Sequence, residues 1–415
     1  MANTQQSVPQ SQAPAPAPAP APQGQASSTL NFEFHGQGME YFRIWIVNIF
    51  LSIITLGIFS AWAKVRREQY FYGNLRLGEQ HFSYLADPVQ ILKGRIIAFG
   101  LLAAYWACWN FIPITAMGLL IVGVLALPAI LVASSRFKMR NSAYRNIRFQ
   151  FTASFGDAYR TFTPPLVIIL LLSAVAYWLL YQVDPETLSA LGAGGQTEDL
   201  ADDFRMTPED YLLSVFYLAL LPFLPYLDYL RAKLLVNHTR WGNQQAAINA
   251  GAGGFYGVFF VGLIITFALA IITGLVVFGI GALLGSMFAD SAMQLLPTGV
   301  ILAITLIYIS MIYASGYWRA ERTNLIYGSS QIGDSRIGSA LTFGQVGKIY
   351  VTNTLAILFS AGLLIPWAHV RLARYIASVS ALSGAHLDHV IAESEAQKSA
   401  FGEGMVDAFD LDLGL

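Results

Sequence analysis

Forty consecutive residues of the chain, 96–135, carry no charged side chain: IIAFGLLAAYWACWNFIPITAMGLLIVGVLALPAILVASS. About 20 apolar residues in a helix, rising about 1.5 Å each, cross a hydrocarbon core of roughly 30 Å, so this stretch is long enough for two crossings. Pro113 lies near its middle, where we expect a tight turn between two paired helices. The stretch therefore predicts a helical hairpin that crosses a membrane twice.

The composition of the whole chain also excludes an ordinary soluble protein. Of its 415 residues, 55% are apolar and 12% are charged, whereas about a quarter of the residues of soluble proteins are charged. This composition makes the lipid bilayer the expected partner. The formal net charge of −1 argues against a nucleic-acid-binding protein. A single cysteine, Cys108, excludes an internal disulfide and a site with several cysteine ligands, and we expect no cofactor.

Hydrophobic segments recur along the chain and predict an all-α fold, a polytopic transmembrane helical bundle with about eight such segments. They lie at residues 44–63, twice within 96–135, and at about 165–183, 211–230, 255–289, 295–318 and 349–368. Segment 255–289 is overlong and rich in glycine, which leaves tilt, a kink or a partial re-entrance near Gly274 open.

The two ends of the chain differ from this membrane domain, which we place at residues 31–382. Residues 1–30 are uncharged and rich in Ala and Pro, and predict an extended, disordered tail. Residues 383–415 hold seven acids and one Lys and predict a polar, acidic tail. His386, His389 and Glu393 follow a helical spacing there, but a solvated helix face explains them better than a metal site.

The distribution of basic residues predicts the orientation of the middle spans. Nineteen of the 24 Lys and Arg fall in four loops, at residues 64–95, 136–160, 231–254 and 319–348. Basic loops stay in the cytoplasm, so these four are expected there. The acidic connection 182–210 is then expected in the periplasm.

The first and last hydrophobic segments have basic residues at both flanks, Arg43 with Lys64 and Lys348 with Arg371. Simple alternation across the membrane places both termini outside. A re-entrant or interfacial position of these segments instead keeps every basic flank inside. Both placements are open, with cytoplasmic termini favoured.

Residues 48–70 align without a gap on residues 353–375, at a constant offset of 305. The seven identities pair Asn48, Gly57, Trp62, Ala63, Val65, Arg66 and Tyr70 with Asn353, Gly362, Trp367, Ala368, Val370, Arg371 and Tyr375. About two identities are expected by chance, so we predict a diverged internal repeat in which 340–382 echoes 31–95. Such duplication is common among transporters but not confined to them. Looser echoes join FEF (32–34) to FQF (149–151).

Three stretches resemble the YjgN family of bacterial inner-membrane proteins: FEFHGQGMEYFRIWIVN (32–48), TLGIFSAWAKVRREQYFYGN (55–74) and ILKGR (91–95). The ending DAFDLDLGL (407–415) is also similar. The resemblance implies a multi-pass protein of the bacterial inner membrane, assigned to a domain of unknown function. It implies no catalytic or ligand-binding residue.

The repeated residues are candidate positions inside the membrane or at its interface. Asn48 and Asn353 predict interhelical hydrogen bonds, and a pseudo-symmetric substrate site is the alternative. Gly57 and Gly362 are expected at close helix packing rather than at hinges. The remaining pairs predict an interfacial belt of aromatic and basic side chains, with anionic lipids as a candidate partner: Trp62, Arg66, Tyr70, Trp367, Arg371 and Tyr375.

Two further features lie in the fifth segment. Pro222 and Pro225 predict a kink, and broken helices build binding sites in many carriers. Asp228 is expected to pair with Arg231 on one helix face, and a proton-relay role for Asp228 is the less favoured alternative.

No nucleophile–base pairing can be assembled from the sequence, so we do not expect an enzyme. Two functions are left open. The first, which we favour, is a carrier or channel-like protein for a small solute. The second is a non-transporting membrane scaffold that binds lipid or envelope partner proteins. A polar cavity lined by Asn48 and Asn353 would favour the first, and a dry interface at these amides the second.

Overall fold

A computed structural model describes residues 29–182, 208–287 and 292–384. Within them, ten short strands form a closed antiparallel barrel in the order β1-β10-β9-β8-β7-β6-β5-β4-β3-β2. The strands are β1 Leu30–Phe34, β2 Leu75–Leu77, β3 Gln80–Tyr84, β4 Ser142–Tyr144, β5 Ile147–Phe151, β6 Thr239–Trp241, β7 Gln244–Ile248, β8 Ser330–Ile332, β9 Ser335–Ser339 and β10 Ser380–Ser383. The prediction of an all-α fold is therefore wrong, although most of the described residues are helical.

Two-residue turns join each three-residue strand to the five-residue strand that follows it. Gly78, Gly242 and Gly333 open three of these turns with φ of +60°, +55° and +55°. Arg145 and Asn146 both have positive φ in the fourth. A positive φ at one or both central residues matches the twist of a hairpin, which explains the glycines. These turns fix the register of the pairs along the barrel.

Each five-residue strand leads into helices that return to the next short strand, of three residues or, in β10, of four, so the order strand–helices–strand occurs five times in the described part of the chain. We number these units 1 to 5, spanning 30–77, 80–144, 147–241, 244–332 and 335–383. Their helices are α1 Gly38–Ile54 and α2 Ser60–Asn74; α3 Pro88–Phe111 and α4 Pro113–Arg140; α5 Phe155–Gln182, α7 Pro208–Leu220 and α8 Phe223–Asn237; α9 Ala252–Met287 and α10 Ala292–Gly328; α11 Phe343–Phe359 and α12 Ile365–Ser378.

The units form a closed ring, because the first helix of each packs against the last helix of its predecessor. Between units 4 and 5 the backbones of α10 and α11 approach so closely that a Cβ atom on Gly316 would lie 2.5 Å from the nitrogen of Gly347. Between units 5 and 1 the Trp367 ring of α12 lies against Gly38 of α1. The pairs Leu30–Leu382 and Asn31–Ala381 complete the barrel at the same place.

Helix length divides the five units into two groups. Five helices are long and apolar enough to cross a membrane: Pro88–Phe111, Pro113–Arg140, Phe155–Ala176, Ala252–Met287 and Gly299–Gly328. All of them belong to units 2, 3 and 4. The break at the predicted Pro113 turn separates the first two, and α9 runs through Gly274 as one helix without a kink or re-entrance.

Of the eight predicted hydrophobic segments, three do not form one continuous helix in the described residues, for two physical reasons. Segments 44–63 and 349–368 each fold back on themselves, as α1–α2 and α11–α12. Segment 211–230 is divided between α7 and α8 by a turn at Leu221–Pro222. Proline and positive-φ turns thus end helices that hydrophobicity alone predicts to be continuous.

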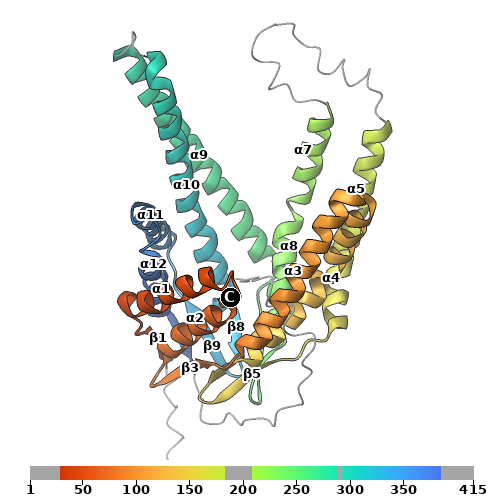
Figure 1. The fold of residues 1–415 in the computed structure, drawn as a ribbon, viewed down its shortest axis with the longest axis vertical. Helices are drawn as coiled ribbons and strands as arrows, with labels where there is room; N and C mark the ends of the chain where they lie inside the picture. The colour runs from red at the N-terminus through yellow and green to blue at the C-terminus, as the bar shows by residue number, and fades with distance from the viewer. Residues whose placement is uncertain (1–28, 183–207, 288–291, 385–415) are drawn as a thin grey trace, which may run out of the picture.

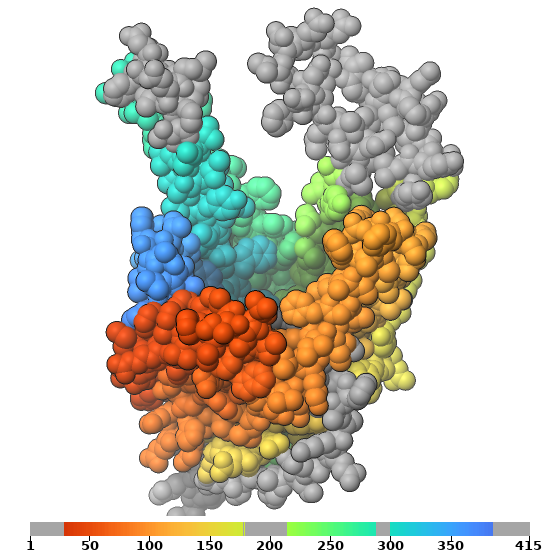
Figure 2. Space-filling view, in the orientation of Figure 1, coloured from red at the N-terminus to blue at the C-terminus, as the bar shows by residue number. Residues whose placement is uncertain are grey.

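Figure 1 shows the consequence for shape: α9–α10 and the α5–α7 pair rise far from the barrel, whereas α1–α2 lies low and across their direction. Figure 2 shows a hollow between these arms, with the short α1–α2 hairpin at its lower edge. Both ends of the described chain lie in the barrel, on the same side of the spans as the four basic loops. This agrees with the non-spanning alternative for the first and last segments.

Candidate functional site

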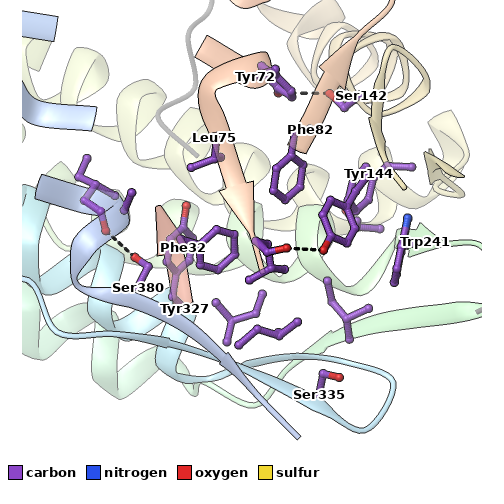
Figure 3. Close-up of a pocket in the computed structure, with 18 of the residues that line it drawn as sticks. Phe32, Tyr72, Leu75, Phe82, Ser142, Tyr144, Trp241, Tyr327, Ser335 and Ser380 are labelled. Carbon is purple, nitrogen blue, oxygen red and sulfur yellow. Dashed lines mark hydrogen bonds between the residues drawn. The ribbon is translucent and has the colours of Figure 1, made fainter. Parts of the chain in front are cut away.

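A cavity of about 580 Å³ occupies the barrel and the space directly above it (Figure 3). This volume lies within the roughly 300–1,000 Å³ of small-molecule sites. Strands and helix ends line it with Phe32, Phe34, Phe71, Tyr72, Leu75, Leu77, Phe82, Lys138, Met139, Ser142, Tyr144, Phe149, Thr239, Trp241, Gln244, Tyr327, Ile332, Asp334, Ser335, Ile337, Ala373, Ile376, Ala377, Ser380 and Leu382. The lining is predominantly apolar and aromatic.

The alternation of side chains along the strands produces this lining. Phe32 and Phe34 of β1 face the cavity, and so do Leu75 and Leu77 of β2. Successive residues of a strand point to opposite faces, so every second side chain enters a barrel. Glu33, between the two phenylalanines, is exposed instead.

Aromatic rings close the floor of the cavity. The Tyr144 ring lies 4.7 Å from the Phe82 ring and 5.5 Å from the Trp241 ring, measured between centroids. The Tyr144 hydroxyl donates to the Leu77 carbonyl at 2.7 Å, and Trp241 Nε1 donates to the Ile147 carbonyl at 3.2 Å. Burial raises the pKa of Tyr144 above its usual value. These polar atoms are satisfied by the backbone, so the floor offers a ligand mainly apolar surface.

The roof of the cavity is built by the last turns of α2, α4, α10 and α12. They contribute Phe71, Met139, Tyr327 and Ile376. In each unit the last helix ends at the barrel, and a helix C-terminus carries roughly half an elementary negative charge. Several such ends around one cavity disfavour an anionic ligand group at this depth.

Most hydroxyl groups in the cavity wall already donate their proton to the protein, so few can donate to a ligand. Ser380 Oγ donates to the Ile376 carbonyl at 2.8 Å, and Thr239 Oγ1 donates to the Leu235 carbonyl at 2.8 Å. Ser142 Oγ lies 2.8 Å from the Lys138 carbonyl and 3.2 Å from the Tyr72 hydroxyl. The lining includes no histidine or cysteine. Its chemistry therefore suits binding by shape and apolar contact.

The repeated asparagines lie elsewhere and do not line this cavity. Asn48 Nδ2 donates to the Ala63 carbonyl at 3.5 Å, and Asn353 Nδ2 donates to the Ala368 carbonyl at 3.2 Å. Each bond joins the two helices of one short hairpin, as the helix-packing interpretation predicts. Asn353 Oδ1 accepts from Arg371 at 3.2 Å, whereas the buried Asn48 Oδ1 has no hydrogen-bond partner among the residues that the structure describes.

The repeated tyrosines make equivalent contacts at the start of α1 and α11. The Tyr70 hydroxyl accepts from the Gln37 backbone nitrogen at 2.7 Å. The Tyr375 hydroxyl accepts from the Thr342 backbone nitrogen at 3.1 Å. Both anchor the last helix of a hairpin to the beginning of its first helix, a structural role.

The close-packing expectation for Gly57 and Gly362 is wrong. They have φ of +90° and +91°, directly after Leu56 and Ala361, which also have positive φ. A Cβ atom on Gly57 would meet nothing within 4 Å. These glycines are needed because the turn adopts a backbone conformation that other residues rarely take.

The repeated Trp and Arg residues have different surroundings in the two hairpins. Arg66 lies over the Phe59 ring at 5.5 Å, and Trp62 stacks on the same ring. Trp367 instead contacts α1, and Arg371 donates to Thr352 Oγ1 at 2.7 Å. Neither pair lines the cavity.

The main partner of Asp228 is Arg322 and not Arg231, the partner that the sequence predicts. Arg322 of α10 donates two hydrogen bonds of 2.7 Å to its carboxylate, whereas Arg231 lies 3.9 Å away. A bidentate guanidinium bond has better geometry than the pair on one helix face, and it ties unit 3 to unit 4. Pro222 immediately precedes α8 at the break, and Pro225 is buried within α8.

His386, His389 and Glu393, the terminal tails and most of the acidic loop lie outside the described residues. Within the described part of the chain, no group of three or more His, Cys, Asp or Glu is placed to hold a metal ion. No metal centre is assigned from these residues.

Sequence reasoning missed the barrel residues that form the cavity. Two signals point to them: the alternation in FEF (32–34) and FQF (149–151), and the turn dipeptides Gly-Glu, Gly-Asn and Gly-Asp that begin at residues 78, 242 and 333. In strands of three to five residues the alternation of apolar and polar positions is too short to recognise beside the long apolar runs of the neighbouring helices.

Comparisons with known proteins identify relatives of the chain. A Salmonella typhimurium protein named Inner membrane protein YjgN is 22% identical over 366 residues, covering 85% of this chain and 88% of the relative. A protein of the same name from Escherichia coli O157:H7 is 29% identical over 154 residues, which span 35% of this chain and 37% of that relative. For the Escherichia coli K12 protein of that name, identity is 48% over 54 residues, 13% of this chain and 14% of the relative. No solved structure matches.

The resemblance to the YjgN family is thus confirmed, and the protein is a multi-pass protein of the bacterial inner membrane. A family model described as a bacterial protein of unknown function matches residues 29–408, so the chain belongs to the DUF898 family.

Proposed function

We propose that the protein binds an uncharged, lipid-like ligand in the barrel cavity and acts as a non-enzymatic, non-transporting membrane protein. The observation that carries this proposal is the aromatic and aliphatic lining of a cavity of about 580 Å³. Burial of an acyl chain contributes about 0.8 kcal/mol per CH₂ group, so the apolar part of the lining supplies most of the affinity, although Lys138 and Asp334 also border the cavity. The helix C-termini above it favour a neutral ligand over an anionic one.

The proposal places the barrel and its cavity at the cytoplasmic surface. Nineteen of 24 Lys and Arg lie in the four loops that include the two-residue turns of the barrel. The positive-inside rule keeps such loops in the cytoplasm. A ligand would then exchange with the cytoplasm or with the adjacent leaflet.

A common origin of the units is part of the same proposal. The hydrogen bonds of Asn48 and Asn353, and those of Tyr70 and Tyr375, recur at the offset of 305. The recurrence of strand, helices and strand in five units supports duplication. A ring of similar units encloses one central site, which suits a single bound molecule.

Small-solute transport has less support. The amides of Asn48 and Asn353 bond within their own hairpins and do not line the cavity. The break at Pro222 is the feature that still favours a carrier. Labelling of a cysteine at Pro222 by water-soluble reagents from both sides of the membrane would favour transport over simple binding.

Fluorescence quenching tests the proposed ligand class. A doxyl-labelled monoacylglycerol is titrated into the detergent-purified protein, and Trp241→Phe identifies the part of the quenching that comes from the cavity. Ala373→Phe fills space at the roof and should weaken binding at least tenfold. Its matched control is Ala103→Phe on the exposed face of α3, which should bind as the wild type does. Unchanged saturable quenching in folded Ala373→Phe would refute the proposal.

A further inference from the structure

We propose that the hairpins α1–α2 and α11–α12 form one platform that inserts only into the leaflet nearest the barrel and holds anionic lipid headgroups along its basic edge. This inference concerns a surface outside the cavity, and it does not depend on a ligand being bound there. The partner is the lipid of one leaflet.

The first argument is length and direction. Helices α1, α2, α11 and α12 have 17, 15, 17 and 14 residues, whereas α9 and α10 have 36 and 37. A helix needs about 20 apolar residues to span a bilayer even when it stands upright. Figure 1 shows α1–α2 lying across the direction of the long arms, so the hairpin follows the membrane plane. A hairpin in that position reaches one leaflet.

The second argument is the exposure of apolar side chains at both hairpin tips. Leu56 is 94% exposed and Ile53 is 69% exposed in the first hairpin. Phe359 is 85% exposed and Leu358 is 71% exposed in the second. Helix α1 packs against α12, so the two hairpins are neighbours and their apolar surfaces adjoin. Exposed apolar side chains of this kind mark an interaction surface, and in a protein of the membrane the lipid is the partner nearest to hand.

The third argument is charge. The four helices contain seven basic residues, Arg43, Lys64, Arg66, Arg67, Lys348, Arg371 and Arg374, and two acidic residues, Glu40 and Glu68. One of those acids, Glu68, is bonded to Arg67 at 3.0 Å. Exposed basic side chains beside an apolar face bind anionic headgroups, and the rings of Trp45 and Trp62 suit the same depth.

The fourth argument is that the turns hold the hairpins closed. Leu56–Gly57 and Ala361–Gly362 have positive φ, and Gly57 and Gly362 donate backbone hydrogen bonds to Ser52 and Ile357 at 2.7 and 2.8 Å. Opening either hairpin into one long helix would abandon this turn. The two hairpins are therefore built to remain folded back.

Cysteine labelling in intact cells tests the placement. In a Cys108→Ser background, Leu56→Cys and Phe359→Cys are compared with Ile112→Cys at the tip of the spanning α3–α4 hairpin. A membrane-impermeant maleimide added from the side opposite the barrel should label residue 112 and leave residues 56 and 359 unlabelled. Labelling of either hairpin tip at the rate of residue 112 would overturn the proposal.

Two further measurements separate lipid insertion from exposure to water, and test the headgroups. A spin label at residue 56 should collide with oxygen more than with a water-soluble nickel complex, and the reverse result would overturn insertion.

Replacing a third of the phosphatidylcholine by phosphatidylglycerol should raise the Tm, and Arg43→Gln with Lys348→Gln should at least halve this rise. The control Arg76→Gln, on the barrel, should leave it unchanged. An equal rise in the double variant would overturn the headgroup contact, whatever the outcome for the cavity ligand.

Discussion

Units 4 and 5 share one architecture and differ in their relation to the membrane. Both begin with a five-residue strand and end with a short strand of the same barrel. Unit 4 carries helices of 36 and 37 residues, and unit 5 carries helices of 17 and 14. The barrel contacts are thus independent of helix length. Unit 4 contributes two of the helices that are long and apolar enough to cross a membrane, whereas the helices of unit 5 are shorter than such a span.

The junction of these two units gives the largest expected effect. Gly316→Ala places a Cβ atom 2.5 Å from the backbone of Gly347, and neither backbone can move away without separating α10 from α11. We expect a loss of about 3 kcal/mol or more in the free energy of unfolding. Thermal unfolding in detergent measures it.

Gly274→Ala is the matched control within unit 4, because a Cβ atom there meets nothing within 4 Å. Alanine favours a helix, so this variant should be neutral or slightly more stable. Equal stability of the two variants would show that α10 and α11 are not packed as described.

A pH titration tests the burial of Tyr41 in the first short hairpin. Burial raises the pKa of Tyr41 in α1 to about 12, so the folded protein keeps a proton that the unfolded chain loses near pH 10. Stability is therefore complete below pH 10 and falls as the pH rises toward 12. The loss should reach roughly 2 kcal/mol.

Tyr41→Phe should remove the part of the alkaline loss that comes from Tyr41 and leave the part that comes from other buried tyrosines such as Tyr144, while Tyr256→Phe at the base of α9 should leave the loss as in the wild type. Denaturant unfolding at pH 9 and pH 11 measures the difference. If Tyr41→Phe and the wild type lose stability in parallel, Tyr41 is not buried at the junction of α1 and α12.

The contact between two long units gives a smaller effect. Asp228→Asn weakens the paired hydrogen bonds to Arg322, each 2.7 Å, and should cost about 1–3 kcal/mol. Arg322→Gln should cost a similar amount. A double-mutant cycle should show strong coupling between the two, and additive effects would assign the stability to Arg231 instead.

The smallest expected effect compares two residues at equivalent positions. Asn353→Leu removes a hydrogen bond from Arg371 and should cost about 1 kcal/mol. Asn48→Leu removes the long 3.5 Å bond to the Ala63 carbonyl together with a buried oxygen that has no partner among the described residues, so it should cost less than Asn353→Leu. Unfolding in the same detergent measures both, and equal losses would contradict the asymmetry of units 1 and 5.

Hydrophobic periodicity predicted the long helices of units 2 and 4 well, because forty uncharged residues admit few other structures. It left segments 44–63 and 349–368 undecided between a span and a re-entrant or interfacial position, because it does not reveal the pair of positive-φ residues that folds each apolar run in two. The gapless alignment at an offset of 305 detected the similarity of units 1 and 5 because their hairpins are nearly equal in length. A gapless alignment did not detect the other units, since their helices differ in length.

The cavity could not be predicted from local patterns. Its floor brings Leu77, Tyr144, Trp241 and Leu382 together from four strands spread over the whole chain. Such pairings depend on ring closure, which local sequence does not encode. The tyrosine and asparagine positions were identified from the sequence, but their roles emerged only from their partners.

The pairing of β1 with β10 has a consequence for how the ring is assembled. Strand β1 is synthesised first and its partner β10 last, so β1 cannot complete its pairing until the end of synthesis. The long helices therefore enter the membrane before the barrel has closed. Once the barrel has closed, this junction lacks the two-residue turn that joins the strands at the other four. A permuted gene that joins residue 384 to residue 29 through a short linker and begins at Asn243 should therefore encode the same ring.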